Sequence, residues 1–209
     1  MLLRRPVKAA AVANLTDARY FAALGVDYLG FALEPGGIPL AEAVAVGEWV
    51  SGPRIVAECG SLPVERIAAL CGELHPDAVE VGAFARPGEV AEATGLPVLQ
   101  VLPVGGDLTV DLARSIAGAG AASAYVVDAA AVPGGWGGLR ENGSWVAWLR
   151  ELGGSSEAYL EVGASADDLD DLLAALPAIG LQVRGGEEEA VGVKSFGELD
   201  AWFERLEVD

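Results

Sequence analysis

Short apolar runs alternate with helical patterns along the chain, beginning with its first segment. Residues 7–13 form an apolar run, a helix opens around Asp17 and ends at Gly25, and a second apolar run covers residues 28–33. Two strands joined through a helix in this way are parallel, and the crossover between them is right-handed. Strands that are apolar on both faces belong to a sheet covered by helices. The pattern therefore predicts an α/β protein.

The same unit recurs to the end of the chain. Further strands are predicted at residues 54–59, 77–81, 96–104, 123–128, 158–162 and 179–184. Helices are predicted at residues 39–51, 63–72, 86–94, 109–118, 144–152, 165–176 and 195–206, and residues 129–143 as the longest and most glycine-rich loop. About eight such units close a barrel. We therefore expect one (β/α)8 TIM barrel over residues 1–209, without a domain linker.

An open doubly wound sheet is the alternative architecture. It would place Gly-x-Gly-x-x-Gly directly after the first strand, where this chain has AAAVAN at residues 9–14. The barrel is therefore favoured. In a barrel the chemistry lies at the carboxyl ends of the strands and in the loops that follow them. For the first two strands these ends lie near residues 10–14 and 33–35.

Composition narrows the classes of function. Of the 209 residues, 52% are hydrophobic, which is enough for one large core. The formal charge of −18, from 31 acidic and 13 basic residues, argues against nucleic acid and against an anionic membrane surface as partners. No apolar run approaches the length of a membrane span. An acidic surface is typical of salt-tolerant proteins, and a coding bias is the alternative explanation; neither assigns a function.

The two cysteines, Cys59 and Cys71, form no CxxC or Cys/His motif, so no disulfide framework and no zinc site are expected. The start MLLRRPVK enters a strand without the apolar core of a signal peptide, which predicts a cytoplasmic protein. We expect neither a metal nor a cofactor. Cys59 ends a strand, but buried cysteines are usually inert.

A few charged side chains lie on the predicted strands. Lys8 is two residues before Ala10 and faces the same side, into the barrel. It is either a catalytic base or Schiff-base former, or the partner of an ion pair with Asp128 or Glu80. Asp128 lies at the end of a predicted strand. It is either a catalytic acid or a carboxylate in an ion pair with Lys8. With Glu80 and Glu161 it forms an inward acidic cluster for a cation or for acid–base chemistry, unless these carboxylates are solvated or paired with arginine.

The opening VKAAAVANLTDARYFAALGVDYLGFALEP, at residues 7–35, resembles that of phosphoribosylanthranilate isomerases, V-K-I-C-G followed by N-L-x-D-A and G-A-D-Y-L-G-F. Later segments are similar in a weaker way: DAVEV to D-A-V-Q-L-H-G, YVVDAAAVPGGWGG to L-L-D-S with G-G-T-G-K, and QVRGG to D-x-S-S-G-V-E. The resemblance implies a barrel of the tryptophan-biosynthesis lineage. It also implies a cofactor-free Amadori rearrangement of an aminoaldose to an aminoketose.

In the family the catalytic base is the cysteine of V-K-I-C-G and the acid is the aspartate of L-L-D. The cysteine position falls on Ala10, whose methyl group cannot accept a proton, whereas the acid survives as Asp128. The family's arginine after the second strand is missing, with Ile38 near its place. Its arginine after the fifth strand is replaced by Pro103. Cys59, at the end of the third predicted strand, is a candidate replacement for the family's catalytic base.

The family's phosphate site lies on glycines after the last two strands. The resemblance carries this role to Gly163, Gly185 and Gly186, with Arg184 beside them. A short helix is expected to begin nearby. Three glutamates at residues 187–189 follow at once and would repel a phosphate dianion.

Three hypotheses follow. The first is a diverged barrel in which the isomerase reaction is lost or strongly reduced. The second is an active isomerase that uses Asp128 as acid and an unorthodox base, with Lys8 and Glu80 as further candidate catalytic residues. The third is a binding or scaffold protein. A small phosphorylated or sugar-like molecule is the expected ligand, and the chain is expected to be a monomer or a homodimer.

Overall fold

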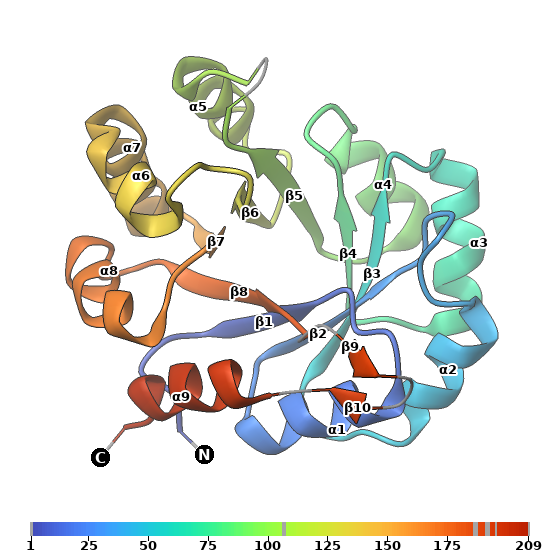
Figure 1. Ribbon diagram of the computed structural model, residues 1–209. Helices are drawn as coiled ribbons and strands as arrows, with labels where there is room; N and C mark the ends of the chain where they lie inside the picture. The colour runs from blue at the N-terminus through green and yellow to red at the C-terminus, as the bar shows by residue number, and fades with distance from the viewer. Residues whose placement is uncertain (1, 106–107, 186–187, 191–192, 195, 209) are drawn as a thin grey trace.

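The structure, a computed structural model, describes residues 2–105, 108–185, 188–190, 193–194 and 196–208. Eight parallel strands form a closed barrel in which each strand pairs with the next along the chain and β8 pairs with β1 (Figure 1). The strands are β1 (Val7–Ala10), β2 (Tyr28–Ala32), β3 (Arg54–Gly60), β4 (Ala78–Val81), β5 (Val98–Pro103), β6 (Ala124–Ala129), β7 (Glu157–Val162) and β8 (Gly180–Arg184). The predicted (β/α)8 TIM barrel is confirmed.

Helices connect the strands and cover the outside of the barrel (Figure 1). They are α1 (Leu15–Leu24), α2 (Leu40–Glu48), α3 (Val64–Leu74), α4 (Pro87–Thr94), α5 (Val110–Gly118), α6 (Gly135–Glu141), α7 (Gly143–Ser155), α8 (Leu169–Ala175) and α9 (Gly197–Leu206), with a 3₁₀ turn, η1 (Ala166–Asp168), before α8. Most predicted elements are present, with ends that differ by a few residues. No helix among the described residues has both the length and the apolar character that crossing a membrane requires.

The first helix shows how its boundaries are set. It begins at Leu15, two residues before the predicted start at Asp17. Asn14 caps it, because its side-chain oxygen accepts a hydrogen bond of 2.9 Å from the backbone N–H of Asp17. It ends at Gly25, which has φ 77°, a left-handed conformation that favours glycine. The predicted strand that stops at Asn14 is therefore shorter, and residues 11–14 form the loop between β1 and α1.

The predicted loop at residues 129–143 is wrong in part, because α6 lies inside it. Trp136 and Leu139 are buried, and their spacing of three residues places them on one helix face. The turn into the helix needs glycine: Gly135 has φ 56°, and a Cβ there would lie 2.0 Å from the carbonyl oxygen of Gly163 on the loop after β7. Glycine-rich composition therefore concealed a helix that packs against the end of β7.

The inside of the barrel is apolar at one end and charged at the other. The apolar cluster consists of Tyr28, Val56, Ala78, Leu99, Ala124, Val126 and Tyr159. Four of these residues are followed two positions later on the same strand by a carboxylate: Val56 by Glu58, Ala78 by Glu80, Val126 by Asp128 and Tyr159 by Glu161. Residues two apart on a strand share a face. The carboxylates therefore point inward at the carboxyl ends of the strands, which we call the mouth of the barrel.

A second apolar layer, between the strands and the helices, contains most of the buried hydrophobic residues. Leu149 on α7 is fully buried in it, whereas Leu112 on α5 is 39% exposed. We expect Leu149→Ala to lower the free energy of unfolding by about 2–5 kcal/mol, because a large cavity remains. Leu112→Ala, the matched control, should cost only about 0.5 kcal/mol. Urea unfolding of both variants checks this, and equal losses would contradict the assignment of the core.

Candidate functional site

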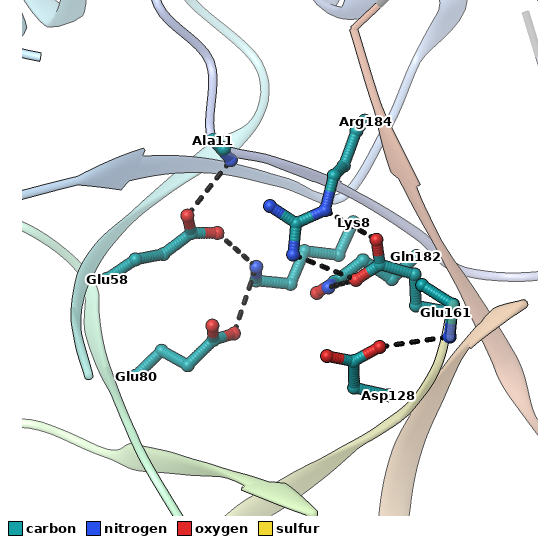
Figure 2. A network of polar contacts seen from close by, with 9 residues as sticks. Lys8, Ala11, Glu58, Glu80, Asp128, Glu161, Gln182 and Arg184 are labelled. Atoms are coloured by element: carbon teal, nitrogen blue, oxygen red, sulfur yellow. Dashed lines mark hydrogen bonds and ion pairs between the residues drawn. The ribbon is translucent and has the colours of Figure 1, made fainter. Parts of the chain in front are cut away.

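A buried lysine joins two carboxylates at the centre of the site. The ammonium of Lys8 on β1 forms ion pairs with Glu58 on β3 and Glu80 on β4, and its Nζ lies 2.9 Å from Glu80 Oε2 (Figure 2). Lys8 is fully buried and both glutamates are 8% exposed. Glu58 also accepts a hydrogen bond of 2.9 Å from the backbone N–H of Ala11. The predicted pair of Lys8 with Glu80 is confirmed, and no such pair with Asp128 is found among the described residues.

Glu58 was missed by the sequence analysis. The signal was present, because Val56 and Glu58 alternate with outward-facing residues along β3 in the same way as Ala78 and Glu80 along β4. β3 and β4 pair with Glu58 directly beside Glu80. Two neighbouring carboxylates on the inside of a barrel require a cation, and Lys8 supplies it.

Burial and mutual charge set the protonation of this group. Burial lowers the pKa of Lys8, but the carboxylates of Glu58 and Glu80 outweigh it, so the pKa of Lys8 is raised. The amine is therefore an ammonium at neutral pH. Burial raises the pKa of Glu80 to about 7, Lys8 acts in the opposite direction, and the charges of Glu58 and Glu161 add to the rise. Glu80 thus exchanges its proton near neutral pH.

Small residues make room for this arrangement. A Cβ on Gly30 of β2 would lie 1.9 Å from the Oε1 atom of Glu58, so the Glu58 side chain keeps its place only while residue 30 has no side chain. Ala11 has φ 50°, in the left-handed region, and this conformation aims its N–H at Glu58. Ala11 stands where the V-K-I-C-G motif has its glycine. The neighbouring Ala10, 1% exposed, stands at the cysteine position.

A second charged group lies on β7 and β8. Both the Nε and Nη2 atoms of Arg184 donate to the carboxylate of Glu161, and Gln182 Nε2 donates to Glu161 Oε2 over 2.6 Å (Figure 2). The Arg184 side chain is 55% exposed and that of Glu161 only 9%. The hydrogen bond to Glu161 raises the pKa of Arg184 despite its partial burial. The alternative in which Glu161 is paired with arginine is therefore confirmed.

Asp128 lies between these two groups, near the end of β6 (Figure 2). Its Oδ1 atom accepts a hydrogen bond of 3.0 Å from the backbone N–H of Ala130. It is half-buried and pairs in register with Glu161. Among the described residues it has no ion pair. The expected acidic cluster is thus two ion-paired groups, one around Lys8 and one around Arg184, with Asp128 beside them.

The residues expected to bind phosphate are only partly described. The carbonyl of Gly163 accepts a hydrogen bond of 2.7 Å from the backbone N–H of Trp136. Gly185 follows β8 directly. Gly186 and Glu187 lie outside the described residues. A helical turn, η1, begins at Ala166 after β7. After β8, the described residues form two short antiparallel strands, β9 (Glu188–Ala190) and β10 (Val193–Lys194).

Cys59 does not reach the mouth of the barrel. It is fully buried in the layer between strands and helices, on the opposite face of β3 from Glu58. Burial raises the pKa of its thiol to about 12, and nearby acidic groups add to this. A thiol that is neutral and faces the helices cannot replace a base at the mouth.

A closed eight-stranded parallel barrel with charged side chains at its mouth is the architecture of TIM-barrel enzymes. No protein-family model matches the chain. The N-(5'-phosphoribosyl)anthranilate isomerases of Rhizobium leguminosarum bv. trifolii and Rhizobium etli are 33% and 31% identical to it, over 74% of this chain and 70% of each relative. The chain belongs to the phosphoribosylanthranilate isomerase family.

Solved structures agree with this assignment. The phosphoribosylanthranilate isomerase of Thermus thermophilus superimposes with a TM-score of 0.72 and 29% identity, over 96% of this chain and 98% of that one. The enzyme of Thermococcus kodakaraensis gives a TM-score of 0.77 at 15% identity, over 96% of this chain and 98% of that one, and shows the shared fold. The predicted membership of this family is therefore confirmed.

The space over Gly30 gives a test of the buried ion pairs. We expect Gly30→Ala to push the Glu58 carboxylate away from Lys8 and to lower the free energy of unfolding by about 3 kcal/mol or more, as for a broken buried ion pair. The matched control is Gly47→Ala on α2, where an added Cβ meets no atom within 4 Å. That change should stabilise by about 0.5–1 kcal/mol. If chemical unfolding gives similar values for both variants, Glu58 is not held as described.

The raised pKa of Glu80 predicts a pH dependence of stability. The folded protein binds this proton more tightly than the unfolded chain, whose pKa is near 4.5, so the stabilisation is complete below that pH and is lost as the pH rises through about 7. Between pH 5 and 7, the free energy of unfolding should fall faster in the wild type than in Glu80→Gln, by up to about 1.4 kcal/mol per pH unit. Urea unfolding across this range measures both slopes. Parallel curves would show that Glu80 does not titrate there.

Proposed function

We propose that this member of the phosphoribosylanthranilate isomerase family has lost the isomerase reaction or retains it at a strongly reduced rate. The observation that carries the proposal is Ala10, which occupies the position of the family's catalytic cysteine and lies two residues after the inward-facing Lys8, on the same face of β1. A methyl group cannot remove the carbon-bound proton. A positioned general base is worth about 10² to 10⁴ in rate.

Two neighbouring groups, Lys8 and Glu58, are poorly suited to replace the missing base. Lys8 is held as an ammonium by Glu58 and Glu80, so it has no lone pair to accept a proton. The carboxylate of Glu58 is occupied by Lys8 and by the backbone N–H of Ala11. Proton abstraction by Glu58 would have to break an ion pair in a buried site, where an unpaired ammonium is costly.

Binding of the family's phosphorylated substrate is also weakened. A phosphoribosylanthranilate isomerase from another organism has been solved with reduced 1-(o-carboxyphenylamino)-1-deoxyribulose 5-phosphate bound. In this chain the exposed arginine nearest to the expected phosphate glycines, Arg184, is engaged by the carboxylate of Glu161. A phosphate would have to compete with that carboxylate for the same guanidinium.

A second candidate function is an active isomerase with an unorthodox base. Two observations favour it: Asp128, the family's acid, has no ion pair among the described residues, and the pKa of Glu80 is near 7. Groups that exchange protons near the working pH are suited to acid–base catalysis. Under this alternative Asp128 protonates the ring oxygen and Glu80 removes the carbon-bound proton, with Lys8 as its counter-ion.

Complementation of a tryptophan auxotroph that lacks this isomerase separates the two functions. We expect the wild-type chain not to support growth without tryptophan, whereas the Rhizobium etli relative, expressed at the same level, does. Purified wild type and Ala10→Cys should be assayed in parallel, because a rise in turnover by about tenfold or more in the variant would show that the missing thiol limits the rate. Growth on the wild-type chain at ordinary expression would overturn the proposal.

A further inference from the structure

The charges at the mouth of the barrel do not balance. The charged residues labelled in Figure 2 are two cations and four carboxylates: Lys8 and Arg184, and Glu58, Glu80, Asp128 and Glu161. Arg184 and Glu161 neutralise each other, and Lys8 serves Glu58 and Glu80 together. Among the described residues, the Asp128 carboxylate accepts a hydrogen bond from the backbone N–H of Ala130 and has no ion pair. After the hydrogen bond that Arg184 donates to Glu161, the charge of Asp128 also contributes to the raised pKa of Arg184. The described side chains drawn in Figure 2 therefore carry an excess of negative charge, opposite in sign to a site for a phosphate ester.

An unused acceptor accompanies this charge. Gln182 is 5% exposed, and its Nε2 atom donates to Glu161. Its buried Oε1 atom has no hydrogen-bond partner in the part of the chain that the structure describes. Figure 2 shows the amide of Gln182 lying between Lys8 and Glu161, above Asp128. A buried carbonyl without a donor costs about 1–3 kcal/mol, so the site calls for an N–H or O–H group that the described residues do not supply.

We propose that the mouth of the barrel binds a small organic cation with N–H donors, of the primary ammonium class, beside Asp128 and Gln182. The inference rests on the proposed function, because an active isomerase would need the same space for a phosphorylated sugar. An ammonium brings positive charge to the Asp128 carboxylate and has three N–H donors, enough to serve Gln182 Oε1 as well. Charged hydrogen bonds of this kind are the strong ones.

A metal ion fits the mouth less well. No group of three or more histidine, cysteine, aspartate or glutamate side chains in the described part of the chain is arranged to hold one. Glu58 and Glu161 already have cationic partners, which a metal ion would have to displace. An organic ammonium needs only Asp128, with Gln182 as a neutral acceptor.

Calorimetric titration of the full chain with four probes tests the proposal: ethylammonium, tetramethylammonium, Mg²⁺ and inorganic phosphate, all at one ionic strength. We expect ethylammonium to bind more tightly than tetramethylammonium, which has no N–H donor. Asp128→Asn should weaken ethylammonium binding by about tenfold or more, as expected for a lost charged hydrogen bond. Asp111→Asn, the matched control, removes the same charge from a side chain on α5 that is 88% exposed, and should leave binding unchanged.

The outcomes separate this inference from the proposed function. The proposal of an ammonium site is overturned if ethylammonium and tetramethylammonium bind equally, or if Mg²⁺ or phosphate binds in place of ethylammonium. It is also overturned if Asp111→Asn weakens ethylammonium binding as much as Asp128→Asn does. Isomerase activity is measured on the same preparations. An inactive wild type without ethylammonium binding overturns only this inference, and an active wild type overturns the proposed function as well. Circular dichroism of Asp128→Asn checks that the variant is folded.

Discussion

The buried ammonium of Lys8 is the constraint on which the rest of the site depends. An ammonium taken out of water without a partner costs several kcal/mol, so the fold must bring carboxylates to it. Glu58 and Glu80 do so from the neighbouring strands β3 and β4, on the side of the barrel reached across β2. Gly30 follows from this arrangement, because a side chain on β2 would occupy the place of the Glu58 carboxylate. One charge thus determines residues on four strands.

The same constraint connects structure to function. A lysine fixed between two carboxylates is a structural cation, and the Glu58 carboxylate, which also accepts a hydrogen bond from the backbone N–H of Ala11, is committed to holding it. On the other side of the mouth, Arg184 is committed to Glu161 in the same way. Lys8 and Arg184 are therefore both paired with carboxylates of the chain itself. The barrel has the fold of the family, while the charged groups at its mouth form ion pairs with one another. Activity therefore has to be argued from these groups and not from the fold.

The fold could be predicted from the sequence because each strand is a short apolar run between helices, and about eight such units close a barrel. Two local features could not. The helix α6 lies in a stretch where glycines outweigh helix formers, and it is stabilised by Trp136 packing that only the tertiary structure provides. The pairing of Glu58 with Lys8 depends on strand order and stagger, so Lys8 was correctly directed inward with Glu80 as a partner, while its second partner was missed.

The roles of Glu58, Glu80 and Gly30 all require Lys8 to be a buried ammonium. The protonation state of its amine can be measured directly in this chain. Lys8 and Lys194 are its only lysines, so selective ¹³C labelling of lysine gives two side-chain signals, which Lys194→Arg assigns. Titrated by NMR in the folded protein, the Lys8 signal should remain that of an ammonium up to and beyond the ordinary lysine pKa of 10.5. A Lys8 signal that titrates below that value, towards neutral pH, would contradict the account, because it would show an amine free to act as a base.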